Sequence, residues 1–197
     1  MGMFALPLLS GALQMQIILS VAITYSIDAD DRITGWSADY SKFALMNDGL
    51  ELIDGTIRGH RLWHFIADSD TRLIYRQMLD HVRKGRPLSF NFRCDGPNAR
   101  RHLTMSISGA EDGAVCFTVN TVATADREYQ PLLDRRFPRT EDEVPFCSWC
   151  NKICVGANMW HEVEDGVQEL GLIDADRMPI LDPVICEACY ELRQSAI

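Results

Sequence analysis

Large apolar residues alternate with small or polar ones along several short stretches of the chain, the period-two pattern of strands that bury one face. This pattern predicts five strands, at residues 21–27, 32–36, 88–92, 103–107 and 115–119. Turn-forming segments separate them, among them Asp28-Ala-Asp-Asp31, Asp95-Gly-Pro-Asn98 and Glu111-Asp-Gly113. Because the last three predicted strands follow one another closely, we expect them to form an antiparallel meander.

Helical periodicity fills the interval between the second and third predicted strands. Residues 39–52 indicate short helical pieces that end at Asn47-Asp48-Gly49, and residues 72–84 predict a longer helix with a cap at Asp70-Thr71. The apolar stripe of the longer helix consists of Ile74, Tyr75, Met78, Leu79 and Val82. The fold class predicted from these elements is α+β, a five-stranded antiparallel sheet with helices on one face.

Residues from about 19 to 123 resemble a PAS sensory domain in the order of their elements and in three phrases. The phrases are Asp30-Asp31-Arg32-Ile33, Gly59-His-Arg-Leu-Trp-His-Phe-Ile-Ala-Asp68 and Thr71-Arg72 at the start of the long helix. The resemblance implies a cupped sheet that can hold a small ligand and that commonly pairs with another copy. Residues of the sheet and its surroundings could line such a pocket, although their spacing marks them first as core: Trp63, Phe65, Phe90, Phe92, Met105 and Phe117.

The resemblance leaves the ligand unknown. Haem-binding relatives place an axial histidine on the long helix, but His81 lies at the flank of the apolar stripe, so we interpret it as a solvated helix-end residue. Neither Cys94 nor Cys116 lies in the reactive-cysteine motif of a flavin photosensor, and we expect both to pack as small apolar side chains.

The first 27 residues contain no charged side chain. A secretory signal needs a basic start, and a membrane-spanning helix needs about 20 mostly apolar residues. Polar residues and Pro7 interrupt this stretch, so we expect no membrane span. Residues 1–18 are interpreted as an uncharged leader, disordered or the result of a misassigned start, before a PAS-like domain at residues 19–123.

Four cysteines near the end of the chain carry the strongest chemical signal. Cys147-Ser-Trp-Cys150 and Cys186-Glu-Ala-Cys189 form a C-x₂-C…C-x₂-C pattern with 35 residues between the pairs. Two such pairs complete a tetrahedral Zn²⁺ site with Zn–S distances of about 2.3 Å. We therefore expect one structural zinc ion in a module at residues 145–197, joined to the PAS-like domain by a linker at residues 124–144.

The interval between the cysteine pairs has structure of its own. Trp160, Val163, Val167 and Leu170 recur at helical spacing before Gly171, and the second pair opens a short helix toward Leu192. This arrangement is similar to a treble clef, and the segment resembles the zinc-binding tails attached to bacterial PAS-type signalling proteins.

Other uses of these thiols stay open. Disulfides would need an oxidising compartment, and no export signal supports one. Cys154 is a bystander, a substitute ligand or a redox-active thiol, and His161 is an alternative fourth ligand. Four thiolates leave no open position on the metal for water, so we do not expect metal catalysis.

The net charge of −9 is concentrated in this module. Residues through Arg139 contain 16 acidic and 16 basic side chains, and the remaining 58 residues contain 12 acidic against three basic ones. Such a module repels a phosphate backbone, so we do not expect a nucleic-acid partner. The basic residues crowded between Arg72 and Arg101 form a solvated exterior, an anion-binding face, or a face that meets the acidic tail of the same or a partner molecule.

The expected function is that of a cytoplasmic, non-enzymatic signalling protein. It combines a PAS-like sensor or protein-interaction domain with a structural zinc module and an acidic tail, and its output passes through a protein partner or a homodimer. One alternative keeps this fold and makes the zinc thiolates a redox sensor. Another is a nucleic-acid-associated regulator that uses the basic face of the PAS-like domain.

Overall fold

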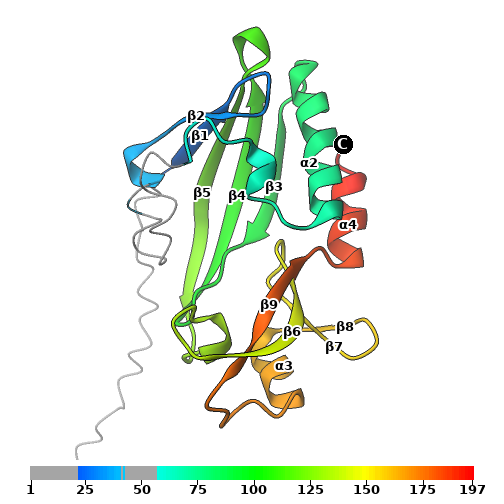
Figure 1. Ribbon diagram of the computed structural model, residues 1–197. Helices are drawn as coiled ribbons and strands as arrows, with labels where there is room; N and C mark the ends of the chain where they lie inside the picture. Colours follow the sequence, from blue (N-terminus) through cyan, green and yellow to red (C-terminus); the bar gives the residue numbers. More distant parts are fainter. Residues whose placement is uncertain (1–21, 41, 43–56) are drawn as a thin grey trace, which may run out of the picture.

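A computed structural model describes residues 22–40, 42 and 57–197 of the chain. In this range the protein is of mixed α+β type, with a five-stranded antiparallel sheet, a second sheet of four strands and a few helices (Figure 1). The predicted leader, residues 1–18, and most of the helical pieces predicted at residues 39–52 lie outside the described residues.

The first sheet joins a hairpin from the start of the chain to a later meander. The hairpin consists of β1 (Ile23–Ile27) and β2 (Ile33–Trp36). The meander consists of β3 (Leu88–Arg93), β4 (Ala99–Gly109) and β5 (Val115–Asp126). Its strand order is β2-β1-β5-β4-β3, because β1 pairs antiparallel with β5 along its whole length. All five predicted strands are confirmed, and β4 and β5 run longer than predicted.

The alternating pattern separates the two faces of this sheet. On β4, buried Leu103, Met105 and Ile107 alternate with the more exposed Thr104 and Ser106. Hydroxyl and amide side chains on the outer face bond across the strands, in the pairs Ser26–Thr34, Ser89–Ser106 and Asn91–Thr104. The inner face therefore supplies the core.

One long helix, α2 (Ser69–Arg83), covers the inner face (Figure 1). Its stripe is buried as predicted, with Ile74, Met78, Leu79 and Val82 each at most 1% exposed. The cap differs from the predicted one, because Asp68 accepts the Thr71 N–H at 2.7 Å. The helix is followed by Gly85, whose φ of +79° favours glycine. Short 3₁₀ turns are η2 (Leu62–His64) and η3 (Glu111–Gly113).

The second sheet has the order β8-β7-β6-β9, and the cysteine pairs lie where β6 and β9 end. Its strands are β6 (Arg139–Cys147), β7 (Ile153–Val155), β8 (Met159–His161) and β9 (Met178–Val184). Its helices are α3 (Val163–Glu169) and α4 (Glu187–Gln194). The strands β6 and β9 are parallel neighbours, which brings residues about 40 positions apart side by side.

Two stretches near this sheet have secondary structure that the sequence did not predict. The segment predicted as a linker, residues 124–144, contains the end of β5, a short 3₁₀ turn, η4 (Pro131–Leu133), and the start of β6. The predicted helix stripe began at Trp160, but Trp160 lies in β8, and the helix begins only at Val163. Trp160 at the strand and Val163 at the helix start are three residues apart, the spacing expected within one helix, so the sequence predicted a helix that began too early.

A small second core forms between α3 and the sheet. Its buried members are Leu132, Val144, Ile153, Val155, Val163, Val167 and Met178. Glycine at position 166 is what permits this approach, because a Cβ there would overlap the Ile153 side chain. After β9 the chain returns to the first sheet, where α4 lies beside α2 and Gln194 donates to Gln77 at 2.8 Å (Figure 1).

Candidate metal centre

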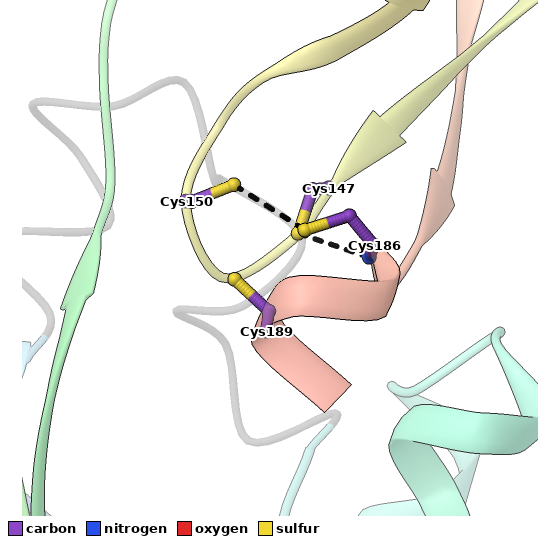
Figure 2. Close-up of side chains that lie close together, drawn as sticks. All are labelled: Cys147, Cys150, Cys186 and Cys189. Atoms are coloured by element: carbon purple, nitrogen blue, oxygen red, sulfur yellow. Dashed lines mark hydrogen bonds between the residues drawn. The ribbon is translucent and has the colours of Figure 1, made fainter. Parts of the chain in front are cut away.

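The four cysteines predicted to bind zinc are brought together at the carboxyl ends of β6 and β9, which are parallel neighbours in the second sheet. Cys147 ends β6, Cys150 follows in the next turn, Cys186 is the N-cap of α4 and Cys189 lies in its first turn. Their Sγ atoms all lie within 4.8 Å of one another (Figure 2). This group of four can hold a metal ion.

Backbone hydrogen bonds shape the turn between Cys147 and Cys150, here called the knuckle. The Cys147 N–H donates to the Lys152 carbonyl and the Asn151 N–H donates to the Cys147 carbonyl, both at 2.8 Å. Asn151 has a φ of +57°, a conformation that asparagine tolerates better than most residues. The tight reversal leads into β7 and leaves both knuckle thiols on one side.

The parallel pairing of β6 with β9 delivers the second cysteine pair. Cys147 is in register with Val184, and the Ser148 N–H donates to the Val184 carbonyl at 2.9 Å. Two residues later the chain reaches Cys186, where α4 begins. Because Cys186 and Cys189 are three apart across a helix start, their thiols reach the same point.

The thiol geometry fits a tetrahedral ion. Cys150 Sγ lies 3.8 Å from Cys186 Sγ (Figure 2), and a tetrahedron with Zn–S bonds of about 2.3 Å has edges of about 3.8 Å. The Cys186 N–H also points at Cys147 Sγ, at 3.4 Å. Cys147 is fully buried, and Cys186 and Cys189 are at most 9% exposed.

Electrostatics also favour a cation at this point. Hydrogen bonds from the Cys150 and Cys189 thiols lower the pKa of Cys147 well below its usual range. The same contacts raise the pKa of Cys150 and Cys189, because a second thiolate beside the first is costly. Four thiols that share one small space therefore ionise together only around a positive ion.

Two residues next to the cysteines fasten the centre to the first sheet. Trp149, between the knuckle cysteines, is 4% exposed, and its ring centroid lies 5.0 Å from that of Phe90 and 5.6 Å from that of Tyr75. Arg193, one turn after Cys189, stacks its guanidinium 4.9 Å from the Trp149 ring and 5.0 Å from the Phe90 ring. It also donates to the Asn91 carbonyl at the edge of β3.

Burial lowers the pKa of Arg193, whereas the negative charges of Cys189 and Cys147 act in the opposite direction. The guanidinium is therefore held close to the thiolates, as a partial counter-charge. A Zn²⁺ ion together with four thiolates would have a combined formal charge of −2. A buried arginine beside this group therefore reduces the free-energy cost of burying it.

A network of ion pairs provides a second attachment between the two sheets. Arg93 of β3 pairs with Glu162 at 2.7 Å, and Arg127 pairs with Glu164 at 2.6 Å and with Asp95 at 3.1 Å. The Asp95 carboxylate is fully buried. Part of the basic stretch therefore meets the acidic tail of the same molecule, and the interpretation of that stretch as a solvated exterior is wrong for Arg93 and Arg100.

Cys154 and His161, the two other candidates, lie outside this group of four. Cys154 sits on β7 and its thiol lies 3.6 Å from the Gly156 carbonyl. His161 Nε2 lies 3.3 Å from a Glu169 carboxylate oxygen.

The predicted pocket residues divide among different surroundings. A cavity of about 250 Å³ on the inner face of the first sheet, here called the sheet cavity, is lined by Tyr25, Ile33, Tyr40, Ile57, Leu62, Phe65, Ile66 and Tyr75. Phe65 is the predicted residue that lines it. A second cavity of about 250 Å³, the knuckle cavity, includes Phe65, Phe90 and Phe92 together with Trp149.

The other three predicted pocket residues line neither cavity. Trp63 donates from its indole to Asp31 at 2.9 Å, and the ring of Phe117 stacks 4.4 Å from that of Tyr25. Met105 accepts a long hydrogen bond of 3.8 Å from the Tyr75 hydroxyl. Burial raises the pKa of Tyr75 to about 12, so this hydroxyl stays protonated at neutral pH.

Sequence reasoning missed the roles of Trp149, Arg193 and Tyr75. For two of these residues, the position in the sequence could have indicated the role. Trp149 lies between two expected ligands, where a large apolar side chain must pack near the metal, and Arg193 lies four residues after Cys189, on the same helix face. Tyr75 belonged to the predicted core stripe, and nothing in the sequence distinguished it from the other residues of that stripe.

In the part of the chain that the structure describes, no helix combines the length and the apolar character needed to cross a membrane.

Comparison with solved structures finds a weak likeness. No family model matches the chain. No curated protein matches it either. Among solved structures, a sensory box sensor histidine kinase from Vibrio cholerae is similar with a TM-score of 0.35 and 13% sequence identity, over 56% of this chain and 84% of that one. This is a level of likeness on which no conclusion about function rests.

Proposed function

We propose that this chain is a non-enzymatic signalling protein, in which a PAS-like sensor or protein-interaction domain is fastened to a treble-clef-like module by one structural zinc ion. The observation that carries the proposal is the group of four converging thiols. Of the residues beside them, Trp149 belongs to the core of the first sheet and Arg193 stacks on Phe90 of the same core. A metal placed there stabilises the module and its attachment at once.

Zinc is the ion that this ligand set favours. Four cysteines at tetrahedral spacing suit zinc or an iron–sulfur centre, and closed Cys₄ sites of this kind are usually structural zinc. Because all four positions would be thiolates, no site for water or substrate is left on the metal. This supports a structural rather than a catalytic role.

The sheet cavity supports the sensor part of the proposal. It lies on the inner face of the first sheet, where the PAS resemblance implies a small-ligand pocket, and three tyrosines add polar groups to an apolar lining. A signal would leave through a protein partner or a homodimer, in a reducing cytoplasm that keeps thiols free for metal.

The two alternative functions receive less support. A redox sensor would gain from a spare thiol beside the zinc ligands, but Cys154 lies outside their group. A nucleic-acid role would use the basic face, and two of its arginines, Arg93 and Arg100, pair with glutamates of the acidic tail.

Native mass spectrometry of the full chain, purified without chelator, tests the proposal together with its absorbance spectrum. We expect one zinc per chain and an added mass from a small ligand. Ile66→Trp, which narrows the sheet cavity, should keep the zinc and lose the ligand. Much less than one zinc per chain would overturn the zinc assignment, and absence of any ligand mass would overturn the sensor assignment.

A further inference from the structure

The knuckle cavity, about 250 Å³ in volume, lies where the start of α2, the strand β3 and the knuckle meet. Its lining shares Phe65, Ile66 and Tyr75 with the sheet cavity, but it also contains side chains from the knuckle and from the start of α2. Phe65, Ser148 and Pro183 are exposed, so a molecule can enter from solvent at this point. Ligand sites are frequent where two structural units meet.

Aromatic side chains line much of the knuckle cavity: Phe65, Tyr75, Phe90, Phe92 and Trp149. Contacts between these rings hold them in place, since the ring centroids lie 5.0 Å apart for Phe90 and Trp149 and 6.4 Å apart for Phe90 and Phe92. The cavity is therefore formed before any ligand arrives, and its walls suit a flat aromatic ring.

Asp68, the N-cap of α2, places a carboxylate at this aromatic wall. Its Oδ2 atom accepts the Thr71 N–H at 2.7 Å, whereas its Oδ1 atom receives no hydrogen bond from any residue that the structure describes. The Tyr75 hydroxyl does not supply one, because it is directed at the Met105 sulfur. One carboxylate oxygen of Asp68 can therefore accept a hydrogen bond from a ligand.

The Thr71 hydroxyl is a second polar group of this wall without a partner. Thr71 lines the cavity and is 6% exposed, and its Oγ1 atom has no hydrogen-bond partner among the described residues. Buried polar atoms nearly always have a partner in folded proteins, because an unsatisfied one lowers stability. A ligand that brings a polar group to the start of α2 would explain why this one has none.

Nearby cations make a positively charged ligand unfavourable. Arg193 stacks on the rings of Phe90 and Trp149, and Arg72 donates from Nε to the Ile66 carbonyl. A negatively charged ligand would be repelled by Asp68, the charged residue among the described lining. A neutral ligand avoids both costs.

We propose that the knuckle cavity binds a small neutral aromatic heterocycle whose ring N–H donates to Asp68. The flat ring system lies against the aromatic wall, and the N–H points at the Oδ1 atom of the carboxylate. A hydrogen bond to an ionised acceptor is stronger than one between neutral groups, so it fixes the orientation of the ring. A cavity of about 150 Å³ already holds benzene, so the larger volume here accommodates a fused two-ring heterocycle.

The test uses the full chain and two probes of the same shape, indole and benzofuran, in isothermal titration calorimetry. Benzofuran has an oxygen atom in place of the indole N–H and therefore donates no hydrogen bond. We expect saturable binding of one indole per chain and binding of benzofuran that is weaker by about tenfold. Equal affinity for the two probes, or no saturable binding of indole, would overturn the proposal.

Matched variants in one helical turn locate the acceptor. Asp68→Asn replaces the carboxylate with an amide that still caps a helix, and it should reduce indole affinity by about fivefold without changing benzofuran affinity. Asp70→Asn removes the same charge from an exposed residue of the first turn that does not line the cavity, and it should leave both affinities unchanged. Equal effects of the two variants on indole binding would contradict the assignment.

A variant that fills the cavity separates it from the sheet cavity. Ser148 is exposed and lines the knuckle cavity but not the sheet cavity. Ser148→Trp should therefore abolish indole binding without changing zinc content or circular dichroism. Retained indole binding in this variant would place the probe elsewhere and overturn the proposal. Because zinc content and the mass of any co-purified ligand are measured separately, failure of this inference is distinct from failure of the proposed function.

Discussion

The five-stranded sheet and the cysteine module bury their interiors by different means. The sheet covers a continuous apolar core with a 15-residue helix whose stripe is almost fully buried. The module has a small core of mostly valine and isoleucine, and its two ends meet at four thiols instead of a larger apolar contact. Small units of this kind rarely reach stability from apolar burial alone, so we propose that a metal held by the four thiols supplies the missing stability.

The two regions also contact each other at two places. Trp149 lies between two of the cysteines, and Arg193 lies one helical turn after another. Both side chains pack against Phe90 in the core of the first sheet. The ion pairs around Asp95 join the same two regions at a second place. Loss of the metal should therefore unfold the module first and weaken the sheet second.

The largest expected effect follows removal of one metal ligand. Cys186→Ser should unfold the module, because binding of structural zinc contributes about 10–16 kcal/mol that becomes folding free energy. Hydrogen exchange should rise sharply in β6–β9 and α4, while β1, β4 and β5 keep most of their protection. Cys154→Ser, a thiol outside the group of four, is the control. Unchanged protection of the module in Cys186→Ser would contradict the account.

Loss of the anchoring indole comes next. Trp149→Ala should reduce the free energy of unfolding by about 3–5 kcal/mol, as expected for a buried aromatic residue. Urea denaturation should show the loss in the sheet as well as in the module, with zinc still bound. Trp160→Ala removes a less buried indole of the same module and should cost clearly less. Equal losses for the two variants would argue against the anchoring role of Trp149.

Removal of the buried charge in the ion-pair network should have a somewhat smaller effect. Asp95→Asn leaves Arg93 and Arg127 facing a neutral amide and should cost about 3 kcal/mol. Thermal unfolding measures this loss against Asp142→Asn, which changes an exposed carboxylate in β6. A loss no greater than that of the control would show that the network does not hold the two sheets together.

The smallest expected effect is a pH dependence at Glu164. Burial raises the pKa of Glu164, but the helix-start N–H and the charges of Arg127 and Arg100 outweigh it, so the pKa is lowered overall. A lowered folded pKa gives stability that is present above the unfolded value, about 4.3, and is lost as the pH falls through the folded value.

Glu164→Gln should therefore flatten the decline in stability below about pH 4, by about 0.5 kcal/mol since the pairs are partly exposed. Denaturant midpoints between neutral and acidic pH measure the effect, with Glu141→Gln as an exposed control. A steeper acid decline in Glu164→Gln than in the parent would show that the sign is wrong.

Local patterns predicted the first sheet well because each strand and the long helix bury one regular face. The stripe at Ile74, Met78 and Val82 and the alternation at Leu103 and Ile107 needed no long-range information. The strand at Met159–His161 was missed because three residues are too few to show alternation. Local sequence patterns could not predict the parallel pairing of β6 with β9 either, because the paired residues lie about 40 positions apart.

In the metal centre, too, the local features were predictable from the sequence and the long-range contacts were not. The two C-x₂-C pairs predicted the cluster, because ligand spacing is a local property. What surrounds the cluster depends on tertiary contacts: Arg193 reaches the Asn91 carbonyl, and Arg93 reaches Glu162 across 69 positions. Sequence periodicity does not predict such partners, so the sequence left open whether the basic stretch is a solvated exterior, an anion-binding face or a face that meets the acidic tail.

The most direct test of the central claim is X-ray absorption at the zinc edge of the full chain, purified without chelator. We predict one zinc per chain with four sulfur neighbours at about 2.3 Å. A shell containing nitrogen or oxygen ligands in place of one or more sulfurs, or a sample with far less than one zinc per chain, would contradict it.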